Sequence, residues 1–330
     1  MERVACVGCG LIGRSWAALF ATKGFRVTMH DLNDRILSNA VDGVKSNLHF
    51  LADQNVIETQ DMERALNRIS TTTSLTEAVS GADYVQESTS ERYAVKKRIF
   101  REMDTSSRPD TILASSTSGL LMTEIQKVTR RPERCIVSHP LNPPHLMPLV
   151  ELVPGKRTSK ETVKKTCELM SRVGKVPIVL RREIVGFIAN RLQAALWREA
   201  IDLVDRGVAS VDDVDKAVHS GLGIRWALIG PHLTIHLGGG RGGMESFIEQ
   251  IGPTFSKCWK DMKVWKKIPN RAARKVIDEV KETTLVRENT LEGLLKCRDS
   301  KILEIVRIKS SRGRCQRFSA SPTSGDLTKN

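Results

Sequence analysis

The chain has 330 residues, of which 40% are hydrophobic and 27% charged, a balance typical of a globular protein with two domains and a sizeable core. No apolar run reaches the roughly 20 residues that span a bilayer, and Glu2 and Arg3 lead straight into a strand-like run, so neither a membrane segment nor a signal peptide is expected. The net charge of +14 comes largely from residues 257–330, which hold 19 Lys and Arg against 9 Asp and Glu. A solvated basic face explains this distribution better than a nucleic-acid surface.

The N-terminal segment has the order strand, glycine turn, helix, strand. Residues 3–8 predict a short buried strand, residues 11–23 a helix that stops at Gly24, and residues 25–30 a second strand closed by Asp31. The turn carries G-x-G-x-x-G, the spacing with which a backbone approaches a pyrophosphate at a helix N-terminus. The cofactor-binding residues predicted from this unit are Gly8, Gly10, Leu11, Ile12, Gly13 and Asp31.

Asp31 indicates which dinucleotide binds. A carboxylate at the end of the second strand accepts hydrogen bonds from ribose hydroxyls and repels a 2′-phosphate, which favours NAD over NADP. Arg35 lies nearby, and an arginine there is a feature that would suit NADP instead.

The same turn also contains Cys6 and Cys9, a C-x-x-C pair with the spacing of a redox motif or of half a zinc site. No second C-x-x-C or H-x-x-x-H supplies the remaining zinc ligands, so no metal site is expected. We interpret Cys6 as a buried strand residue and expect the Cys9 thiol beside the cofactor phosphates, where thiol reagents would reach it. The seven cysteines, an odd number, indicate reduced thiols and a cytoplasmic protein.

Further strands alternate with helices along the first half of the chain. Residues 83–87, 111–115, 134–138 and 149–153 predict strands, and residues 93–103 predict a helix. Such alternation is typical of a mostly parallel sheet covered on both faces. We therefore expect an α/β fold with a Rossmann domain over residues 1–183.

From residue 184 onward the pattern is helical. Residues 184–206 form one long amphipathic run, Ser210 with Asp213 has the spacing of a helix start, and residues 245–251, 271–281 and 290–309 also predict helices. An all-α substrate and dimerisation domain is expected over residues 184–309. Residues 310–330 are rich in Ser, Gly and charge, which predicts a disordered basic tail.

His139 and Glu151 are the residues on which acid–base chemistry is expected. His139 ends a predicted strand in the Rossmann half, where open α/β sheets bind their ligands, and imidazole is a suitable base near neutral pH. Glu151 stands inside the apolar run LVELV, so it needs a polar partner, which a histidine on a neighbouring strand would supply. A satisfied core histidine and a surface acid on an edge strand are the alternatives.

Several motifs in the same order resemble those of the L-3-hydroxyacyl-CoA dehydrogenase superfamily: GCGLIG, SSTSGL (115–120), SHPLNPP (138–144), PLVELV (148–153) and GFIANR (186–191). The resemblance runs from about residue 3 to residue 250. It implies a Rossmann domain, a helical domain that dimerises, and oxidation of a β-hydroxyl by NAD. By the same resemblance His139 is the general acid and base, Glu151 is its partner, and Ser118 and Asn190 bind the substrate oxygen.

Within the superfamily, residues 195–210, 221–244 and 247–253 resemble the carnitine dehydrogenases, which oxidise L-carnitine to 3-dehydrocarnitine. The lambda-crystallin and L-gulonate 3-dehydrogenase branch is also similar, sharing GRSWA and NPP, but less so over residues 225–253. The chain departs from the carnitine pattern at Pro144 and His145, where an aromatic often stands, and in the partly kept tryptophan-rich stretch at 256–263.

A quaternary ammonium suits the face of a tryptophan, and a carboxylate suits an arginine. Asn190, Ala194 and Trp197 have the spacing of one helix face, and Trp226 follows Arg225. Trp197 and Trp226 are therefore the candidates for the ammonium, and Arg225 or Arg198 for the carboxylate. Core tryptophans of a helical domain are the alternative.

The sequence thus predicts a cytoplasmic homodimeric NAD-dependent dehydrogenase of a small L-3-hydroxy acid, with L-carnitine the leading substrate and no membrane or nucleic-acid partner. A 3-hydroxyacyl-CoA and L-gulonate are the rival substrates. A crystallin-like structural protein and an anion-binding protein that uses the basic C-terminus are the alternatives outside enzymes.

Overall fold

The computed structural model describes residues 1–311. They divide into two compact units, a first unit of Met1–Trp197 and a second unit that begins at Arg198. The expected boundary stands after residue 183, whereas this division lies after Trp197, within helix α8 (Ala189–Asp205). The expected tail lies outside the described residues except for Ser310 and Ser311, which belong to the last helix, α16 (Leu291–Ser311).

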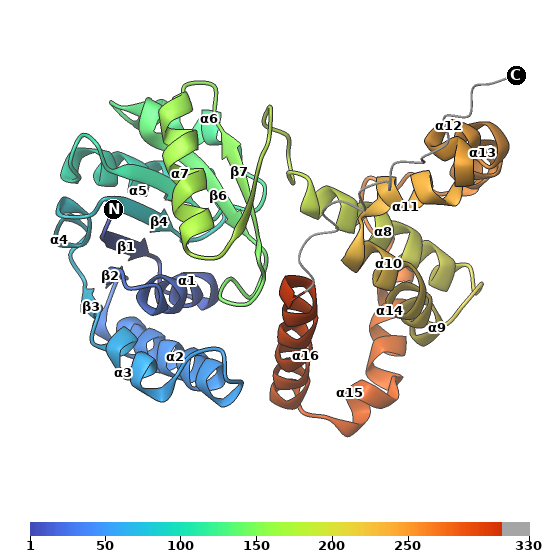
Figure 1. The fold of residues 1–330 in the computed structure, drawn as a ribbon, viewed down its shortest axis with the longest axis horizontal. Helices are drawn as coiled ribbons and strands as arrows, with labels where there is room; N and C mark the ends of the chain where they lie inside the picture. Colours follow the sequence, from blue (N-terminus) through green and yellow to red (C-terminus); the bar gives the residue numbers. More distant parts are fainter. Residues whose placement is uncertain (312–330) are drawn as a thin grey trace, which may run out of the picture. The chain divides into compact units, whose positions relative to one another are not determined.

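The first unit is built around one eight-stranded sheet with the order β3-β2-β1-β4-β5-β6-β7-β8 (Figure 1). Neighbouring strands are parallel except for the antiparallel pair β6 and β7. The strands are β1 (Arg3–Val7), β2 (Arg26–His30), β3 (Ile69–Thr72), β4 (Tyr84–Glu87), β5 (Ile112–Ser115), β6 (Cys135–Pro140), β7 (Leu149–Pro154) and β8 (Val176–Val179). The expected α/β class with a mostly parallel sheet is confirmed.

Helices cover both faces of this sheet, because successive side chains of a strand point to opposite faces. Ala5, Val85 and Leu113 belong to one buried cluster with residues of α4, α5 and α6. Trp16 and Phe20 of α1 are fully buried outside this cluster. Phe20 contacts the ring of Tyr84, which precedes Val85 on β4 and so points to the opposite face of the sheet. The helices of this unit are α1 (Leu11–Thr22), α2 (Asp34–Asp53), α3 (Thr59–Leu66), α4 (Leu75–Ser80), α5 (Tyr93–Ser106), α6 (Met122–Ile125) and α7 (Lys160–Arg172).

The described part of the second unit is helical, as expected. Ser210 accepts a hydrogen bond from the Asp213 amide and so begins α9 as its spacing predicts. The helices after α8 are α9 (Val211–Ala217), α10 (Gly223–Leu228), α11 (Pro231–Gly238), α12 (Gly243–Gln250), α13 (Gly252–Asp261), α14 (Asn270–Glu282), α15 (Thr284–Glu288) and α16.

The expectation of one helix over residues 184–206 is wrong at its start, because α8 begins at Ala189. Gly186 and Phe187 have φ angles of 78° and 52°, in the left-handed region that a right-handed helix cannot include. Residues 184–188 therefore form a turn that enters the helix. This turn places Phe187 in the core and leads the chain to the functional site.

Candidate active site

The carboxyl ends of the parallel strands bring the chemically important residues of the first unit to one edge of the sheet. Gly8 follows β1, Ser88 follows β4, Ser116 follows β5, and His139 lies near the end of β6. Ligands of open α/β sheets bind at this edge. Every residue of the candidate catalytic group discussed below belongs to the first unit.

The glycine loop has the close backbone approaches that its spacing predicts. Gly8 has a φ of 89°, and a Cβ there would come within 2.8 Å of the Ser88 backbone. A Cβ on Gly13 would lie 1.8 Å from the Gly8 carbonyl oxygen, so α1 packs against the loop with no room for a side chain. A Cβ on Gly10 would meet no atom within 4 Å. The loop is thus packed tightly against the protein at Gly8 and Gly13 and is open at Gly10, which leaves space for a pyrophosphate to approach its backbone.

The start of α1 is suited to a phosphate group. Among the described residues, no side chain caps this helix end, where Leu11 and Ile12 stand. Its first amides therefore remain available to an anion, which the helix dipole also favours.

Asp31 ends β2 beside this loop. Its two carboxylate oxygens accept the backbone amides of Cys9 at 2.7 Å and Leu32 at 2.8 Å, which fixes the carboxylate. A cavity of ≈ 250 Å³ opens here, lined by Val7, Gly8, Gly10, His30, Asp31, Leu32, Ser88, Thr89, Ser90, Val95, Arg98 and Ile99. A carboxylate beside apolar walls and an open glycine loop fits the adenosine half of a dinucleotide.

The expectation that the Cys9 thiol is open to reagents is wrong. Cys9 is 3% exposed, and its thiol donates to the His30 carbonyl at 3.3 Å. Burial, with the nearby Asp31 charge, raises the pKa of Cys9 to about 12, so the reactive thiolate does not form near neutral pH. Cys6 is a buried residue of β1, and neither cysteine forms a disulfide.

His139 and Glu151 face each other across the antiparallel pair β6 and β7, where they are register partners. His139 Nδ1 lies 2.8 Å from Glu151 Oε2, and both side chains are buried. Because an ionised carboxylate only accepts hydrogen bonds, Nδ1 carries the proton and donates it to Glu151. Nε2 is then left with a lone pair that can take a proton.

Glu151 is held from its other side as well. Its Oε1 accepts the backbone amides of Ile188 at 2.8 Å and Ala189 at 3.0 Å, at the start of α8. Burial favours the neutral acid, but the His139 and amide hydrogen bonds outweigh it, and the pKa of Glu151 lies below its usual value. The carboxylate is therefore ionised near neutral pH and orients the imidazole.

Ser118 and Asn190 are brought together at the same edge. Asn190 Nδ2 donates to the Ser118 carbonyl at 2.9 Å. Glu91, which the sequence analysis did not single out, accepts the Ser118 amide at 2.9 Å and its hydroxyl at 3.3 Å. Glu91 follows the end of β4 by a few residues, the same signal that marked His139, so the sequence offered a means to find it.

Phe187 is a second residue that the sequence analysis missed. Its ring lies 5.4 Å from the His139 ring and is fully buried, although its φ of 52° is unusual for a large side chain. The surrounding core holds this conformation, and the ring forms an apolar wall beside the imidazole. In sequence it stands inside the motif GFIANR, but its apolar spacing is that of an ordinary helix face, so its place beside the imidazole was not predicted.

The four candidate substrate residues lie on two helices. Trp197 is on α8 with Asn190, at the spacing of one helix face, and its side chain is 55% exposed. Trp226, 37% exposed, stands with Arg225 on α10 of the second unit. Neither tryptophan is therefore a core residue of this chain. Arg198 follows Trp197 at the start of the second unit.

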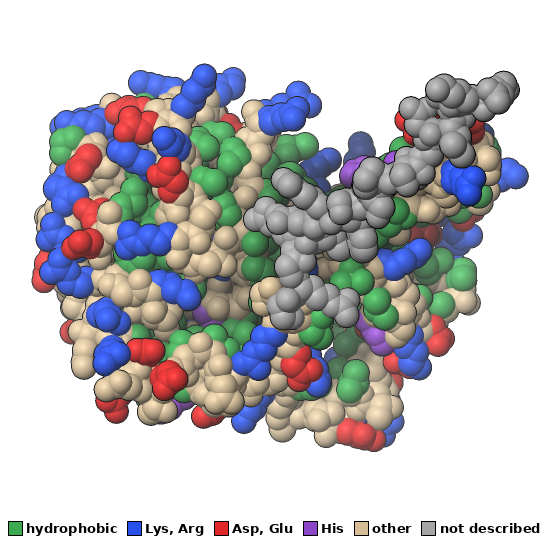
Figure 2. Space-filling view, in the orientation of Figure 1, with side chains coloured by type: hydrophobic (Ala, Val, Ile, Leu, Met, Phe, Trp, Pro, Cys, Tyr) green, Lys and Arg blue, Asp and Glu red, His purple; other side chains and the backbone are tan. Residues whose placement is uncertain are grey.

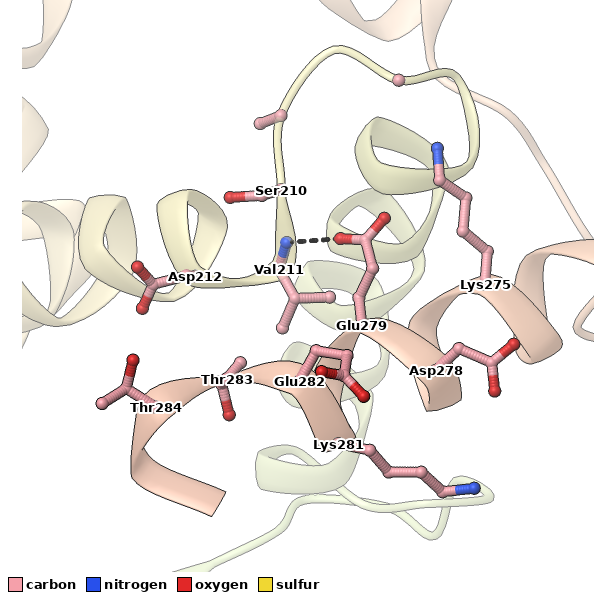
Figure 3. A pocket seen from close by; sticks show the side chains of 12 residues that line it. Ser210, Val211, Asp212, Lys275, Asp278, Glu279, Lys281, Glu282, Thr283 and Thr284 are labelled. Atoms are coloured by element: carbon pink, nitrogen blue, oxygen red, sulfur yellow. Dashed lines mark hydrogen bonds between the residues drawn. The ribbon is translucent and has the colours of Figure 1, made fainter. Parts of the chain in front are cut away.

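A larger cavity, of ≈ 830 Å³, lies in the second unit between the turn at 207–210 and helix α14 (Figure 3). Figure 3 shows Glu279 pointing at the Val211 amide, which donates to it at 3.0 Å. This contact and the Ser210 cap satisfy amides at the start of α9. Both carboxylates and lysines line the cavity. The contact between Glu279 and the Val211 amide stabilises the start of α9 and indicates no ligand.

On the face in Figure 2, Lys and Arg are interspersed with Asp and Glu and do not gather in one patch. Within residues 1–311, no group of three or more His, Cys, Asp or Glu is placed to hold a metal ion. No described helix combines the length and the apolar character that crossing a membrane requires.

Two family models match the chain. The NAD-binding domain of 3-hydroxyacyl-CoA dehydrogenase matches residues 3–184, and the C-terminal domain of the same enzyme matches residues 186–279.

Among curated relatives, the L-carnitine dehydrogenase of Oceanobacillus iheyensis is 35% identical over 314 residues, which cover 93% of this chain and 97% of the relative. That of Nocardiopsis dassonvillei is 41% identical over 259 residues, 78% of each chain. Two solved structures are also similar. The NAD⁺-dependent 5-formyl-3-hydroxy-2-methylpyridine 4-carboxylic acid 5-dehydrogenase has a TM-score of 0.80 and 27% identity, covering 95% of this chain and 100% of that one. The (S)-3-hydroxybutyryl-CoA dehydrogenase of Ralstonia eutropha has a TM-score of 0.64 and 31% identity, covering 78% and 88%.

Proposed function

The chain belongs to the 3-hydroxyacyl-CoA dehydrogenase family and is an NAD-dependent oxidoreductase acting on a CH–OH group, and from this premise we propose that it oxidises L-carnitine to 3-dehydrocarnitine. The observation that carries the choice of substrate is the similarity, at 35–41% identity over most of the chain, to relatives named L-carnitine dehydrogenase. The buried His139–Glu151 pair supplies the acid–base chemistry that this reaction needs.

In the proposed mechanism His139 is the general base. Its Nε2 takes the proton of the 3-hydroxyl. Nδ1 keeps its own proton and donates it in a hydrogen bond to Glu151. The Glu151 carboxylate stabilises the imidazolium that forms, and the two helix amides keep that carboxylate ionised. In the reverse direction the imidazolium returns the proton to the carbonyl oxygen.

Bound NAD would supply the hydride acceptor for the carbon that bears the hydroxyl. The residues that would hold it are Gly8, Gly10, Leu11, Ile12, Gly13 and Asp31. The open backbone at Gly10 and the uncapped helix end suit its phosphates, and the fixed Asp31 carboxylate suits a ribose diol.

Ser118 and Asn190 would bind the reacting oxygen. Asn190 Nδ2 uses one N–H on the Ser118 carbonyl and keeps a second N–H to donate. Glu91 accepts the Ser118 amide at 2.9 Å and so fixes its backbone. The Ser118 hydroxyl, which donates to Glu91 over 3.3 Å, would turn its single O–H to the substrate oxygen.

The ends of carnitine require an ammonium site and a carboxylate site. Trp197 and Trp226 are the candidates for the trimethylammonium, since both are partly exposed and each offers an aromatic face. Arg225 or Arg198 would pair with the carboxylate.

The test is NADH formation, followed by absorbance, with L-carnitine, L-gulonate, 3-hydroxybutyrate and 3-hydroxybutyryl-CoA as separate substrates. We expect kcat/KM for L-carnitine to exceed each of the others by at least about 100-fold, because a site built for a polar group rejects analogues that leave it unpaired. Turnover of 3-hydroxybutyryl-CoA in preference to carnitine would show that the proposed substrate is wrong. The reaction type, oxidation of a hydroxyl by NAD, would remain. The absence of NADH formation with all four would overturn the proposed substrate and leave a different hydroxy compound as the substrate of this oxidoreductase.

The oligomeric state is part of the same proposal: the second unit assembles with a second copy of this chain. Its helices leave large apolar side chains open to solvent, among them Leu237, Ile248 and Trp259 at 60%, 59% and 65% exposure. A homodimer would cover such faces, as the family resemblance implies.

A further inference from the structure

Lys175 is a buried cation that the proposed mechanism does not use. It is 7% exposed, directly before β8. Its Nζ donates to the Met147 carbonyl at 2.7 Å and also to the Pro144 carbonyl. Burial lowers the pKa of Lys175 to about 7, because the buried ammonium loses its hydration. A buried ammonium costs free energy, so its retention calls for a role.

Both carbonyls that Lys175 binds belong to the connection between β6 and β7, residues 141–148. This connection starts two residues after His139 and ends three residues before Glu151. The amides of Leu146 and Met147 turn back onto the Pro143 carbonyl, both at 3.0 Å. Lys175 therefore closes the outer end of the hairpin whose two strands hold the catalytic pair.

The backbone before Lys175 is fixed by the end of α7. Gly174 has a φ of 84°, its amide donates to the Ser171 carbonyl, and the Lys175 amide donates to the Met170 carbonyl. This is the Schellman arrangement of a helix C-terminus. It fixes the backbone of Lys175, from which the side chain enters the interior.

Beneath Lys175 lies the face of Trp16, with Nζ 5.0 Å from the ring centroid. Trp16 belongs to α1, the helix that opens at the glycine loop, and its side chain is fully buried. Its Nε1 donates to Ser116 Oγ at 3.2 Å, two residues before Ser118. One aromatic ring thus contacts both the lysine that holds the 141–148 connection and the segment that carries Ser118.

We infer that Lys175, seated on Trp16, is a positioning residue that fixes the 141–148 connection beside His139 and ties it to the cofactor helix α1. The kinetic part of this inference rests on the proposed function, because it concerns how the 3-hydroxy acid is held against His139. The structural part concerns the chain alone and is measured without substrate.

The first measurement is hydrogen exchange of the Leu146 and Met147 amides in the protein without ligands. Lys175→Met removes the charge and all three donors at similar length, and we expect both amides to exchange at least about tenfold faster than in the wild type. Lys164→Met is the matched control, since Lys164 is an exposed lysine of α7, and it should leave both amides within twofold. Lys175→Arg keeps donors and charge and should retain most of the protection.

The second measurement separates positioning from general stability. With L-carnitine, Lys175→Met should raise KM or lower kcat so that kcat/KM falls about tenfold, because small displacements in a site cost large factors in rate. The dissociation constant for NADH, from fluorescence titration, should change less than twofold. A loss spread equally over substrate, cofactor and melting temperature would contradict positioning and indicate a merely structural lysine.

Unchanged exchange at Leu146 and Met147 in Lys175→Met would overturn the inference, as would free exchange of both amides in the wild type. Should Lys175→Met not fold, Lys175→Leu also removes every donor on a shorter apolar chain, and exchange within twofold of wild type there would overturn it equally. If L-carnitine is not oxidised, the proposed substrate fails, and the exchange measurement still decides the role of Lys175.

Discussion

The two units differ in where their hydrophobic side chains lie. In the first unit whole rings such as Trp16, Phe20 and Phe100 have no exposed surface between the sheet and its helices. In the described part of the second unit, the buried hydrophobic residues are Ile201, Val204, Val211, Ala272 and Leu303, while many large hydrophobic side chains of its helices are exposed. Figure 2 shows such hydrophobic surface on the helices that follow α8.

This difference shows which unit buries its hydrophobic side chains without help from a second chain. A densely packed core holds its side chains in fixed positions, and the His139–Glu151 pair stands on two strands of such a core. A set of amphipathic helices with few buried residues lacks that internal support, and it gains stability by covering its apolar faces. The chemistry is therefore expected in the first unit, and the association with a second copy in the second.

The largest effect should come from His139→Gln, which tests whether the chemistry belongs to the first unit. Glutamine cannot take the hydroxyl proton, and we expect kcat with the preferred substrate to fall by about 10² to 10⁴. NADH absorbance gives the rate, and NADH binding should persist because the glycine loop is untouched. His49→Gln, an exposed histidine of α2, is the control. Activity within tenfold of wild type would remove His139 from the mechanism.

The next effect compares one leucine from each unit. Leu113→Ala empties space in the fully buried core of the first unit, and the free energy of unfolding should fall by about 2–5 kcal/mol. Leu237→Ala, in a residue that is 60% exposed, should change it by less than about 0.5 kcal/mol in the monomer. Urea titrations at low protein concentration measure both. Equal losses would show that the second unit has a core as complete as that of the first.

A charge on the open face of the second unit should break the proposed dimer. Ile248→Glu places a carboxylate on an apolar side chain that is 59% exposed, and the dimer dissociation constant should rise at least about 30-fold, or about 2 kcal/mol. Sedimentation over a range of concentrations measures it. Val56→Glu, a 44% exposed position of the first unit, should leave the dimer intact. A wild type that stays monomeric throughout would refute the assembly.

The last effect, and the smallest when it is taken per pH unit, is a pH dependence confined to the first unit. The pKa of Lys175 is about 7 in the native state against an ordinary value of 10.5, so the unfolded chain binds one more proton between these values. Stability therefore rises with pH in this window, by up to ~1.4 kcal/mol per pH unit from this group, and the contribution is lost as pH falls to about 7. Lys175→Met should lack this slope and Lys164→Met should keep it, in urea titrations from pH 7 to 9. Parallel curves for Lys175→Met and the wild type would contradict the prediction.

The sequence predicts the fold well wherever a short motif agrees with the secondary structure predicted on either side of it. The glycine loop needs a strand before it and a helix after it, and that context identifies the first βαβ unit. Strand β8 was not predicted, because Pro177 interrupts its short run, although an edge strand tolerates proline. The start of α8 was misplaced because the apolar spacing continues through Gly186 and Phe187, and spacing alone does not report a positive φ.

The candidate site is predictable only in part, for a similar reason. His139 and Glu151 are visible in sequence because a polar residue in an apolar strand needs a partner, and the β6–β7 register brings them opposite each other. Lys175 and Trp16 meet across a sequence separation that no local pattern spans. Cys9 shows the opposite failure, since a motif spacing suggests reactivity and only its burial shows that the thiol is protected.

The position of Glu151 tolerates few substitutions, because both of its carboxylate oxygens accept hydrogen bonds. One carboxylate oxygen serves the imidazole and the other serves two amides, and all of these partners are donors. Glutamine would have to turn its own N–H groups toward one of them, and aspartate is one carbon too short to reach both. A glutamine that accepts the amides and donates to His139 would hold the ring in its other tautomer, with the proton on Nε2 and no base facing the substrate. The exchange of a single oxygen for nitrogen, which conserves size and shape, would therefore silence an otherwise intact site.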